Sequence, residues 1–415
     1  MSNCGFLSPH YSFYYPDLTI LGGEGPYACG LRDGEEEPDD YIDASSQWGV
    51  LALGYNHEAL QSAMAMCSFM GLTHVCGVDF RHQSQEQLAA ALVKRMPEGQ
   101  QEWRVFFTNS GTEAIEGAMK LARCYTQKPG FVSLLGAFHG RTMGAMSLGT
   151  AALLHKHLFG DFIPTIQIVP GGTEYLKVLE NMVYPASQEI AAFFIEPVQG
   201  VGGCHTIDPD FVKEIRNFCD RNKVLLVADE VQSGCGRTGK FFAFEHSDIV
   251  PDVVCLAKPL GGGLPLGAVI AKKEICVWPE GAHGSTFGGN PMACAAGVAL
   301  LEVIDDNFLM DIRNNSLCFK ENLQTKLSKI YPTLGFDWRI QGVGFMLAID
   351  LPNKEFRRRV MDYAYQEKLL VATAEPSAIR LLPPLNTPQE VLREIADILI
   401  RSIDKAIKDE LKKIS

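Results

Sequence analysis

The middle of the chain alternates between short apolar runs and longer stretches with helical periodicity. The apolar runs that predict strands lie at 103–107, 131–135, 191–195, 224–228 and 253–256. Such alternation is typical of a mainly parallel sheet with helices on both faces. The run at 266–272 is expected to add an antiparallel strand at the edge of this sheet.

The two ends of the chain follow a different pattern. Residues 30–44 predict two short strands around an acidic turn at 35–40, and a helix is expected at 84–96. The helices expected nearer the C-terminus begin after Pro291, near 354 and at Pro388. We therefore expect three parts, namely an N-terminal arm with part of a small domain (1–60), a large domain (61–300) and a C-terminal small domain (301–415).

The composition narrows the class of protein. With 415 residues, 47% of them hydrophobic and 21% charged, the chain suits a soluble globular protein. A net charge of −12 opposes nonspecific nucleic-acid binding, and no apolar run reaches the ~18 residues of a membrane helix. The twelve cysteines form no C-x-x-C pair, which favours reduced thiols over disulfides or zinc. Because no signal-peptide pattern is visible either, we expect a cytoplasmic protein without a metal, nucleic-acid or membrane partner.

Two predicted strands end in residues that suit one cofactor. Asp229 and Glu230 follow the run at 224–228, and Lys258 follows the next run along the chain. Ligands of α/β proteins bind at the carboxyl ends of parallel strands, so these side chains are expected at the same rim. Pyridoxal phosphate needs a lysine that carries it covalently and an acidic partner for its ring nitrogen. Taken singly, Asp229 could instead cap a helix, and Lys258 could be a surface charge.

Two turns upstream suit the phosphate and the ring of the same cofactor. Ser110, Gly111 and Thr112 follow a predicted strand and open a helix, whose N-terminal N–H groups and dipole attract anions. Simple helix capping would explain the same residues. Phe138 and His139 follow the next strand, where an aromatic side chain can stack on a planar ring or pack in the core.

Together these motifs resemble the class III aminotransferases, the family of the ornithine, acetylornithine and 4-aminobutyrate aminotransferases. The resemblance rests on DEVQ at 229–232, Lys258 with the glycines at 261–263, GAFHGRT at 136–142 and GSTFGGN at 284–290. It covers roughly residues 20–405. It implies an α/β enzyme of fold type I with bound pyridoxal 5'-phosphate, in which a large domain with a mainly parallel seven-stranded sheet accompanies a smaller α/β domain.

The resemblance also assigns roles to individual residues. Lys258 would carry the cofactor and move the proton during the reaction, while Asp229 would keep the ring nitrogen protonated. The other cofactor contacts that it implies are Ser110, Gly111 and Thr112 at the phosphate, Phe138, His139 and Val231 at the ring, and Gln232 at the ring hydroxyl. Thr286 would reach the phosphate of the neighbouring subunit, which implies a homodimer with shared active sites.

Four further residues fall on the substrate side of the family's site. Glu196 and Arg380 match a pair whose arginine binds the α-carboxylate of glutamate or 2-oxoglutarate and whose glutamate masks that arginine. Arg141 matches the arginine that holds the far carboxylate of an ω-amino acid or the α-carboxylate of a diamino acid. Trp48 matches a position that varies between subfamilies. An arginine taken alone would more often form a structural ion pair, and Trp48 could equally be a half-buried aromatic residue of the core.

Three features depart from the family pattern. The acidic turn at 35–40 is longer than the usual Asp-Gly turn, and Val201 stands where many glutamate-using members have an acidic residue. Trp48 and the GYNH spelling at 54–57 resemble the diaminopelargonic acid aminotransferases. Arg141 opposes that assignment, because those enzymes lack an arginine at its position.

We therefore interpret the chain as a homodimeric aminotransferase that moves the terminal amine of an ω-amino or diamino acid to 2-oxoglutarate. The reaction would be ping-pong, with the cofactor carrying the amine between the half-reactions as pyridoxamine phosphate. Racemisation or decarboxylation on the same cofactor site is the first alternative, and a non-catalytic regulatory protein is the second. Arg380 with Glu196 favours transamination, while Lys258 with Asp229 opposes a non-catalytic role.

Overall fold

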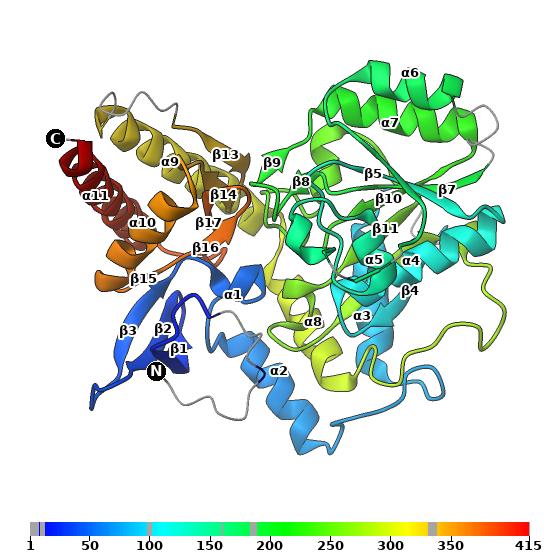
Figure 1. Cartoon of the computed structure of the whole chain (residues 1–415). Coiled ribbons are helices and arrows are strands. Elements are labelled where there is room, and N and C mark those ends of the chain that lie inside the picture. Colours follow the sequence, from blue (N-terminus) through cyan, green and yellow to red (C-terminus); the bar gives the residue numbers. More distant parts are fainter. Residues whose placement is uncertain are drawn as a thin grey trace.

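The computed structural model describes residues 8, 13–97, 102–157, 159–160, 162–182, 189–330 and 338–414. Figure 1 shows a larger lobe, built on a seven-stranded sheet, beside a smaller lobe that carries the C-terminal helices. The N-terminal strands lie beneath those helices, so both ends of the described chain contribute to the smaller lobe. Within the described ranges, no helix is both long enough and apolar enough to cross a membrane.

The large sheet runs in the order β4, β12, β11, β10, β7, β5, β6. Its strands are β4 (Trp103–Thr108), β5 (Gly130–Leu134), β6 (Thr165–Ile168), β7 (Ile190–Ile195), β10 (Leu225–Asp229), β11 (Val253–Leu256) and β12 (Gly267–Lys272). All the strands expected from apolar runs are present, and β6 is one that the pattern did not reveal. Only β12 is antiparallel to its neighbours, so the prediction of a mainly parallel α/β sheet is confirmed.

The expected position of β12 was wrong. This strand is antiparallel, but it lies between β11 and β4, and β4 forms the edge of the sheet. Residues 267–271 are all buried, as is usual for a strand paired on both sides. A Cβ at Gly267 would lie 2.4 Å from the Thr108 hydroxyl, so the glycine allows β12 to approach β4 closely.

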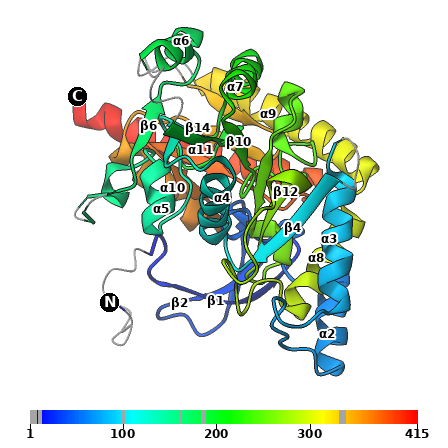
Figure 2. The ribbon, with the colours of Figure 1, turned by 90° about the vertical axis from the view of Figure 1, so that its right-hand side faces the viewer.

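Alternate residues of the sheet face two separate layers of helices. Leu225 and Val227 of β10 belong to a core cluster with α4 (Gly111–Thr126), while Leu226 and Ala228 belong to the main core with α7 (Pro209–Asn222). In Figure 2, α3 (Gln83–Arg95) and α8 (Pro291–Val303) stand together beyond β4, and α4 lies on the other side. Because both faces are covered, polar chemistry is confined to the strand ends.

The smaller lobe combines C-terminal and N-terminal strands. One sheet consists of β13 (Ile340–Val343), β14 (Met346–Ile349), β17 (Ala378–Leu381) and β16 (Ala372–Ala374), and another of β1 (Leu18–Glu24), β2 (Tyr27–Arg32), β3 (Asp39–Asp43) and β15 (Leu369–Leu370). The pairing of β2 with β3 confirms the expected strands around the acidic turn. Parallel pairing of β15 with β3 joins the two ends of the chain.

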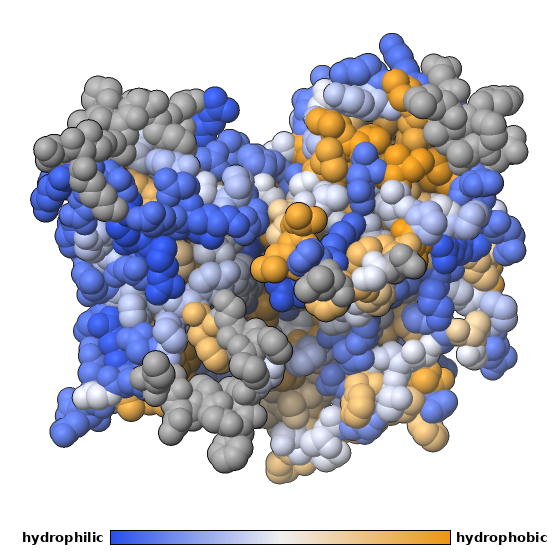
Figure 3. Space-filling view, viewed as in Figure 1, coloured by the Kyte–Doolittle hydropathy of each residue, from blue (hydrophilic) through white to orange (hydrophobic). Residues whose placement is uncertain are grey.

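The remaining helices are divided between the two lobes. They are α1 (Ser46–Gly49), α2 (Glu58–Phe69), α5 (Met143–Leu148), α6 (Thr173–Met182), α9 (Asp306–Ile330), α10 (Lys354–Gln366) and α11 (Gln389–Ile414), and a short hairpin is formed by β8 (Val198–Gln199) and β9 (His205–Thr206). The helical stretch expected after Pro291 is divided into α8 and α9. Figure 3 shows that the C-terminal helices present a mostly hydrophilic surface, whereas apolar side chains gather over the larger lobe.

Candidate functional site

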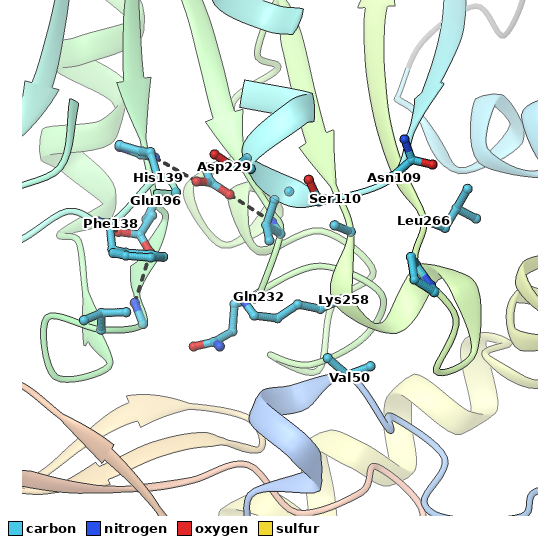
Figure 4. Close-up of a pocket in the computed structure, with 18 of the residues that line it drawn as sticks. Val50, Asn109, Ser110, Phe138, His139, Glu196, Asp229, Gln232, Lys258 and Leu266 are labelled. Carbon is cyan, nitrogen blue, oxygen red and sulfur yellow. Dashed lines mark hydrogen bonds and ion pairs between the residues drawn. The ribbon is translucent and has the colours of Figure 1, made fainter. Parts of the chain in front are cut away.

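A cavity of about 420 Å³ opens at the carboxyl ends of the parallel strands. Its volume is in the range typical of small-molecule sites. The residues expected at the site that line it are Ser110, Gly111, Thr112, Phe138, His139, Glu196, Asp229, Val231, Gln232 and Lys258. Figure 4 shows Asp229 and His139 at the strand ends, with Val50 facing the cavity from the N-terminal part of the chain.

Asp229 and His139 form a buried pair at the floor of this cavity. The Nδ1 atom of His139 lies 2.7 Å from the Asp229 carboxylate, to which it donates because a carboxylate only accepts. The Asp229 carboxylate also accepts from the Val231 backbone N–H at 3.0 Å. Burial alone would lower the pKa of His139, but the hydrogen bond and the charge of Asp229 outweigh it and raise that pKa. Asp229 is thereby held in a fixed orientation by two hydrogen bonds.

Lys258 follows β11 directly and has an unusual backbone. Its φ of 36° lies in the left-handed region, which costs a non-glycine residue conformational energy. Within the described ranges its amine forms no hydrogen bond or ion pair. Burial lowers the pKa of Lys258 to about 8, although Asp229 opposes the shift. About a tenth of this amine is therefore unprotonated at pH 7, far more than for an ordinary lysine, as a nucleophilic or basic lysine requires.

The N-terminus of α4 forms another wall. Ser110 caps the helix, its hydroxyl accepting from the Glu113 N–H at 3.3 Å, so the capping explanation applies to this residue. Gly111 lies against Val231, and a Cβ at Gly111 would approach the Val231 Cγ1 to 2.6 Å. The hydroxyls of Thr112 and Thr142 lie 2.7 Å apart beside this turn. The wall therefore offers backbone N–H groups and hydroxyls, which are the donors that a phosphate needs.

Glu196 is buried and engaged by the backbone. Its carboxylate accepts from the N–H of Phe138 at 2.8 Å and from that of Gly200 at 3.2 Å. Burial raises the pKa of Glu196 to about 7, and the charge of His139 opposes the rise. No ion pair joins Glu196 to Arg380, although both residues are fully described. The expected masking pair is thus absent from this structure.

Arg380 is instead held by two other residues of the predicted site. Its Nη1 donates to the Gln232 side-chain oxygen at 2.7 Å, and its guanidinium carbon lies 4.8 Å from the centre of the Trp48 ring. Burial lowers the pKa of Arg380. Gln232 lines the cavity, whereas Arg380 does not.

A second pocket of about 730 Å³ contains the remaining substrate-side residues. Trp48 and Arg141 line it together with Tyr14, whose ring lies 5.9 Å from that of Trp48. Arg141 is exposed, and its guanidinium lies 3.5 Å from the His155 ring nitrogen. Thr286 is exposed and does not line the cofactor-side cavity of its own chain.

Two residues that line these pockets, and one that contacts their lining, were not expected from the sequence. Asn109 lines the inner cavity and donates to Glu113, and its position between β4 and Ser110 was the available signal. Tyr14 lies in an arm for which no local motif was recognised. His155 packs against Phe138, with ring centres 5.3 Å apart, and also approaches Arg141. Neither Tyr14 nor His155 could be found from sequence, because their contacts depend on the tertiary fold.

The inner cavity fits pyridoxal phosphate on structural grounds. This cofactor needs a turn that binds its phosphate, an aromatic side chain that stacks on its ring, an acid for its ring nitrogen and a free amine. The turn at 110–112, Phe138, Asp229 and Lys258 supply these in one cavity. The absence of a side chain at Gly111 leaves space beside Val231 that any Cβ would fill.

Comparisons with known proteins agree with this arrangement. The family model described as "Aminotransferase class-III" matches residues 28–403. The acetylornithine aminotransferase of Caldanaerobacter subterraneus subsp. tengcongensis is 37% identical over 392 residues, covering 93% of this chain and 94% of its own length. The acetylornithine aminotransferase of Aquifex aeolicus is 37% identical over 396 residues, covering 91% of this chain and 96% of its own length.

Solved structures give the same result. A structure of the ornithine aminotransferase of Toxoplasma gondii, described as having partial occupancy of PLP at its active site, matches with a TM-score of 0.86 and 26% identity, covering 99% of this chain and 94% of that one. A transaminase of the marine bacterium Virgibacillus matches with a TM-score of 0.86 and 25% identity, covering 97% of each chain.

Proposed function

The chain belongs to the class-III aminotransferases, and from this we propose that it moves the terminal amine of an ω-amino or diamino acid to 2-oxoglutarate. It is a transaminase that uses pyridoxal phosphate. The observation that carries the proposal is the cavity in which the free amine of Lys258 lies with the His139–Asp229 pair. The relatives' names make N-acetylornithine and ornithine the first donors to test.

Bound pyridoxal phosphate would supply an electron sink for the pair released when a substrate C–H bond breaks. Asp229 would hold the ring nitrogen protonated, and His139 would fix the orientation of that carboxylate. Lys258, once released from the cofactor, would take the proton from the substrate carbon that carries the amine. It would then deliver this proton to the cofactor carbon, a role that suits an amine with a pKa of about 8.

The other residues of the cavity would position the cofactor. The turn at 110–112 would receive the phosphate, while Phe138 and Val231 would enclose the ring. Gln232 would approach the ring hydroxyl, and Glu196, which accepts from the backbone N–H of Phe138, would hold that aromatic residue in place. These roles follow from the lining of the cavity and from the family's motif.

The two arginines would divide the recognition of carboxylates. Arg141 in the outer pocket would bind the carboxylate of the amino donor, and Arg380 would bind the α-carboxylate of 2-oxoglutarate. A guanidinium can bind a carboxylate through two parallel hydrogen bonds, which gives both affinity and orientation. Trp48 and Tyr14 would form the apolar wall of the donor's path.

A homodimer would complete each site. Met66, Phe69, Met70 and Phe80 are exposed along α2 and the segment after it, with Phe69 90% exposed. Phe287 is also exposed and contacts His74 of that segment, with ring centres 4.9 Å apart. Exposed apolar patches mark interaction surfaces. Covering this patch with a second copy of the chain would bring Thr286 to the partner's site.

We place the enzyme in the cytoplasm on the basis of its composition.

Other reactions on this cofactor receive no support from the named relatives. Those described above are called aminotransferases or transaminases. The racemase, decarboxylase and regulatory alternatives therefore rest on the shared cofactor site alone.

A half-reaction screen tests the proposal. Holoprotein without acceptor should convert its cofactor absorbance to that of the pyridoxamine form when N-acetylornithine or ornithine is added. Simple alkyl amines without a carboxylate should react more slowly, because they cannot engage Arg141. Release of carbon dioxide or racemised donor without this conversion would reject transamination.

A further inference from the structure

Arg380 has an incomplete set of hydrogen bonds. Only 1% of its surface is exposed, yet its Nε is buried without any partner. The one hydrogen bond of its guanidinium in the described part of the chain is the 2.7 Å contact from Nη1 to Gln232. An unpaired donor in the interior costs free energy unless a ligand satisfies it in another state. The Nε–H group therefore has unused hydrogen-bonding capacity, which a carboxylate can satisfy only after a neighbouring side chain moves.

Gln232 and Trp48 contact this arginine and also contact each other, so the three residues form one cluster. The Gln232 amide nitrogen donates to the Trp48 carbonyl at 3.2 Å, while its oxygen accepts from Arg380. This orientation of the amide is required, because arginine can only donate and a carbonyl can only accept. The Trp48 indole then covers the guanidinium at 4.8 Å, within the range of a cation–π interaction.

The backbone around Trp48 is held firmly in place. Ser46, Gln47 and Trp48 have φ angles of 39°, 49° and 65°, a left-handed run that costs conformational energy in non-glycine residues. The buried Asp43 carboxylate compensates by accepting hydrogen bonds from the side chains of Ser45, Gln47 and Tyr55. The position of the indole over Arg380 is thus built into the turn after β3.

The cluster of Arg380, Gln232 and Trp48 also lies between the two pockets. Gln232 lines the inner cavity, Trp48 lines the outer pocket, and Arg380 lines neither. In Figure 4 the amide end of Gln232 points away from Asp229, toward the C-terminal segment. Glu196 accepts from the N–H groups of Phe138 and Gly200 and forms no ion pair with Arg380. A carboxylate that reaches Arg380 must therefore displace the indole or the amide rather than Glu196.

We propose that Trp48 and Gln232, rather than Glu196, hold Arg380 in the resting site and thereby set the affinity for the α-carboxylate of a dicarboxylic 2-oxo acid. Trp48 is the specificity-determining residue of this arrangement, since its indole covers the guanidinium and also lines the outer pocket. The inference rests on the proposed function, because it takes Arg380 as the carboxylate site. In the resting site, the arginine is bound by the neutral amide of Gln232 and covered by the indole of Trp48.

Binding of glutarate, an unreactive five-carbon diacid, to the holoprotein tests this directly by calorimetry. Trp48→Leu removes the aromatic cover while keeping an apolar side chain, so glutarate should bind about threefold to tenfold more tightly. Trp48→Phe keeps a weaker aromatic face and should give an intermediate affinity, and it also serves if the leucine variant folds poorly. Trp278→Phe is the matched control, since Trp278 packs on Phe106 and His283 away from both pockets.

Tryptophan fluorescence gives a second measurement on the same samples. Glutarate should change the emission of wild type and of Trp278→Phe, and Trp48→Phe should lose that change. Unchanged or weaker glutarate binding in Trp48→Leu would overturn the inference. So would tighter binding in Glu196→Gln than in Trp48→Leu, because Glu196 would then be the resting partner.

Two outcomes distinguish an error in this inference from an error in the proposed function. If wild type transfers amine to 2-oxoglutarate but Trp48→Leu binds glutarate no more tightly, only the role of Trp48 is wrong. If wild type neither binds glutarate nor transfers amine to 2-oxoglutarate, then Arg380 does not bind carboxylates and both are wrong.

Discussion

The chemistry of the site depends on how the fold alters individual side chains, and Lys258 is the clearest case. Its amine has no partner in the described ranges, and burial lowers its pKa to about 8. Capture of pyridoxal phosphate by the cofactor-free protein requires the unprotonated amine. The capture rate should therefore rise with pH through about 8 and level off above, as stopped-flow absorbance can follow. A rate that keeps rising to the pH at which an ordinary lysine titrates, roughly 10.4, would show that burial does not activate Lys258.

Asp229 should matter for rate rather than for cofactor attachment. Asp229→Asn removes the charge that holds the ring nitrogen protonated but keeps the hydrogen-bonding geometry near His139. The half-reaction should slow by on the order of 100-fold or more while the cofactor stays bound, as single-turnover absorbance would measure. Asp252→Asn is the control: this buried aspartate pairs with Arg216 and Lys272, so its loss should lower thermal stability instead. Equal rates for wild type and Asp229→Asn would exclude Asp229 from the chemistry.

Residues next to a strand end could be predicted from the sequence, and residues brought in by tertiary contacts could not. Asp229, Lys258 and Phe138 each follow an apolar run, and all three line one cavity. The partner of Arg380 was not predictable, because Gln232 lies 148 residues away in the chain. The same applies to Tyr14, which reaches the outer pocket from the N-terminal arm.

At the level of elements, the phosphate site depends on close packing between α4 and the residues after β10. Gly111→Ala would place a methyl group 2.6 Å from the Val231 Cγ1, so one of the two segments must shift. We expect at least about tenfold weaker binding of pyridoxal phosphate, measured by fluorescence titration of the cofactor-free protein. Gly22→Ala is the matched control, because a Cβ at Gly22 meets no atom within 4 Å. Equal cofactor affinity in both variants would show that the α4 turn does not bind the phosphate.

The order of the strands could be predicted less well than their existence. Continuous apolar runs gave β4, β5, β7, β10, β11 and β12, since burial on both faces leaves that pattern. The place of β12 inside the sheet depends on its pairing with β4, which no local pattern specifies. The short strand β6 has only one buried residue, Ile168, so its pattern carried little signal.

For the whole molecule, the central expectation is that two chains share each site. A heterodimer of Lys258→Ala and Thr286→Ala chains, isolated with two different affinity tags, tests this. If Thr286 serves the partner's site, one of the two sites is intact, and the heterodimer should show about half of the wild-type activity. If Thr286 serves its own chain, neither site is intact and the activity should stay near the mean of the two parents.

Assembly and domain boundaries are the properties that the sequence pattern specifies least. The exposed residues Phe69, Met70 and Phe287 indicate an interface only once the fold shows that nothing of the described chain covers them. The division at residues 60 and 300 stays a prediction. Pairing of β15 with β3 nevertheless shows how the N-terminal strands can belong with the C-terminal part.

Transfer of labelled nitrogen tests the central claim most directly. Holoprotein is incubated with 2-oxoglutarate and N-acetylornithine whose terminal amine carries ¹⁵N, and the products are analysed by mass spectrometry. The wild-type protein should produce ¹⁵N-glutamate, and Lys258→Ala should produce none. Glutamate without the label, or label transfer that survives the loss of Lys258, would contradict the central claim.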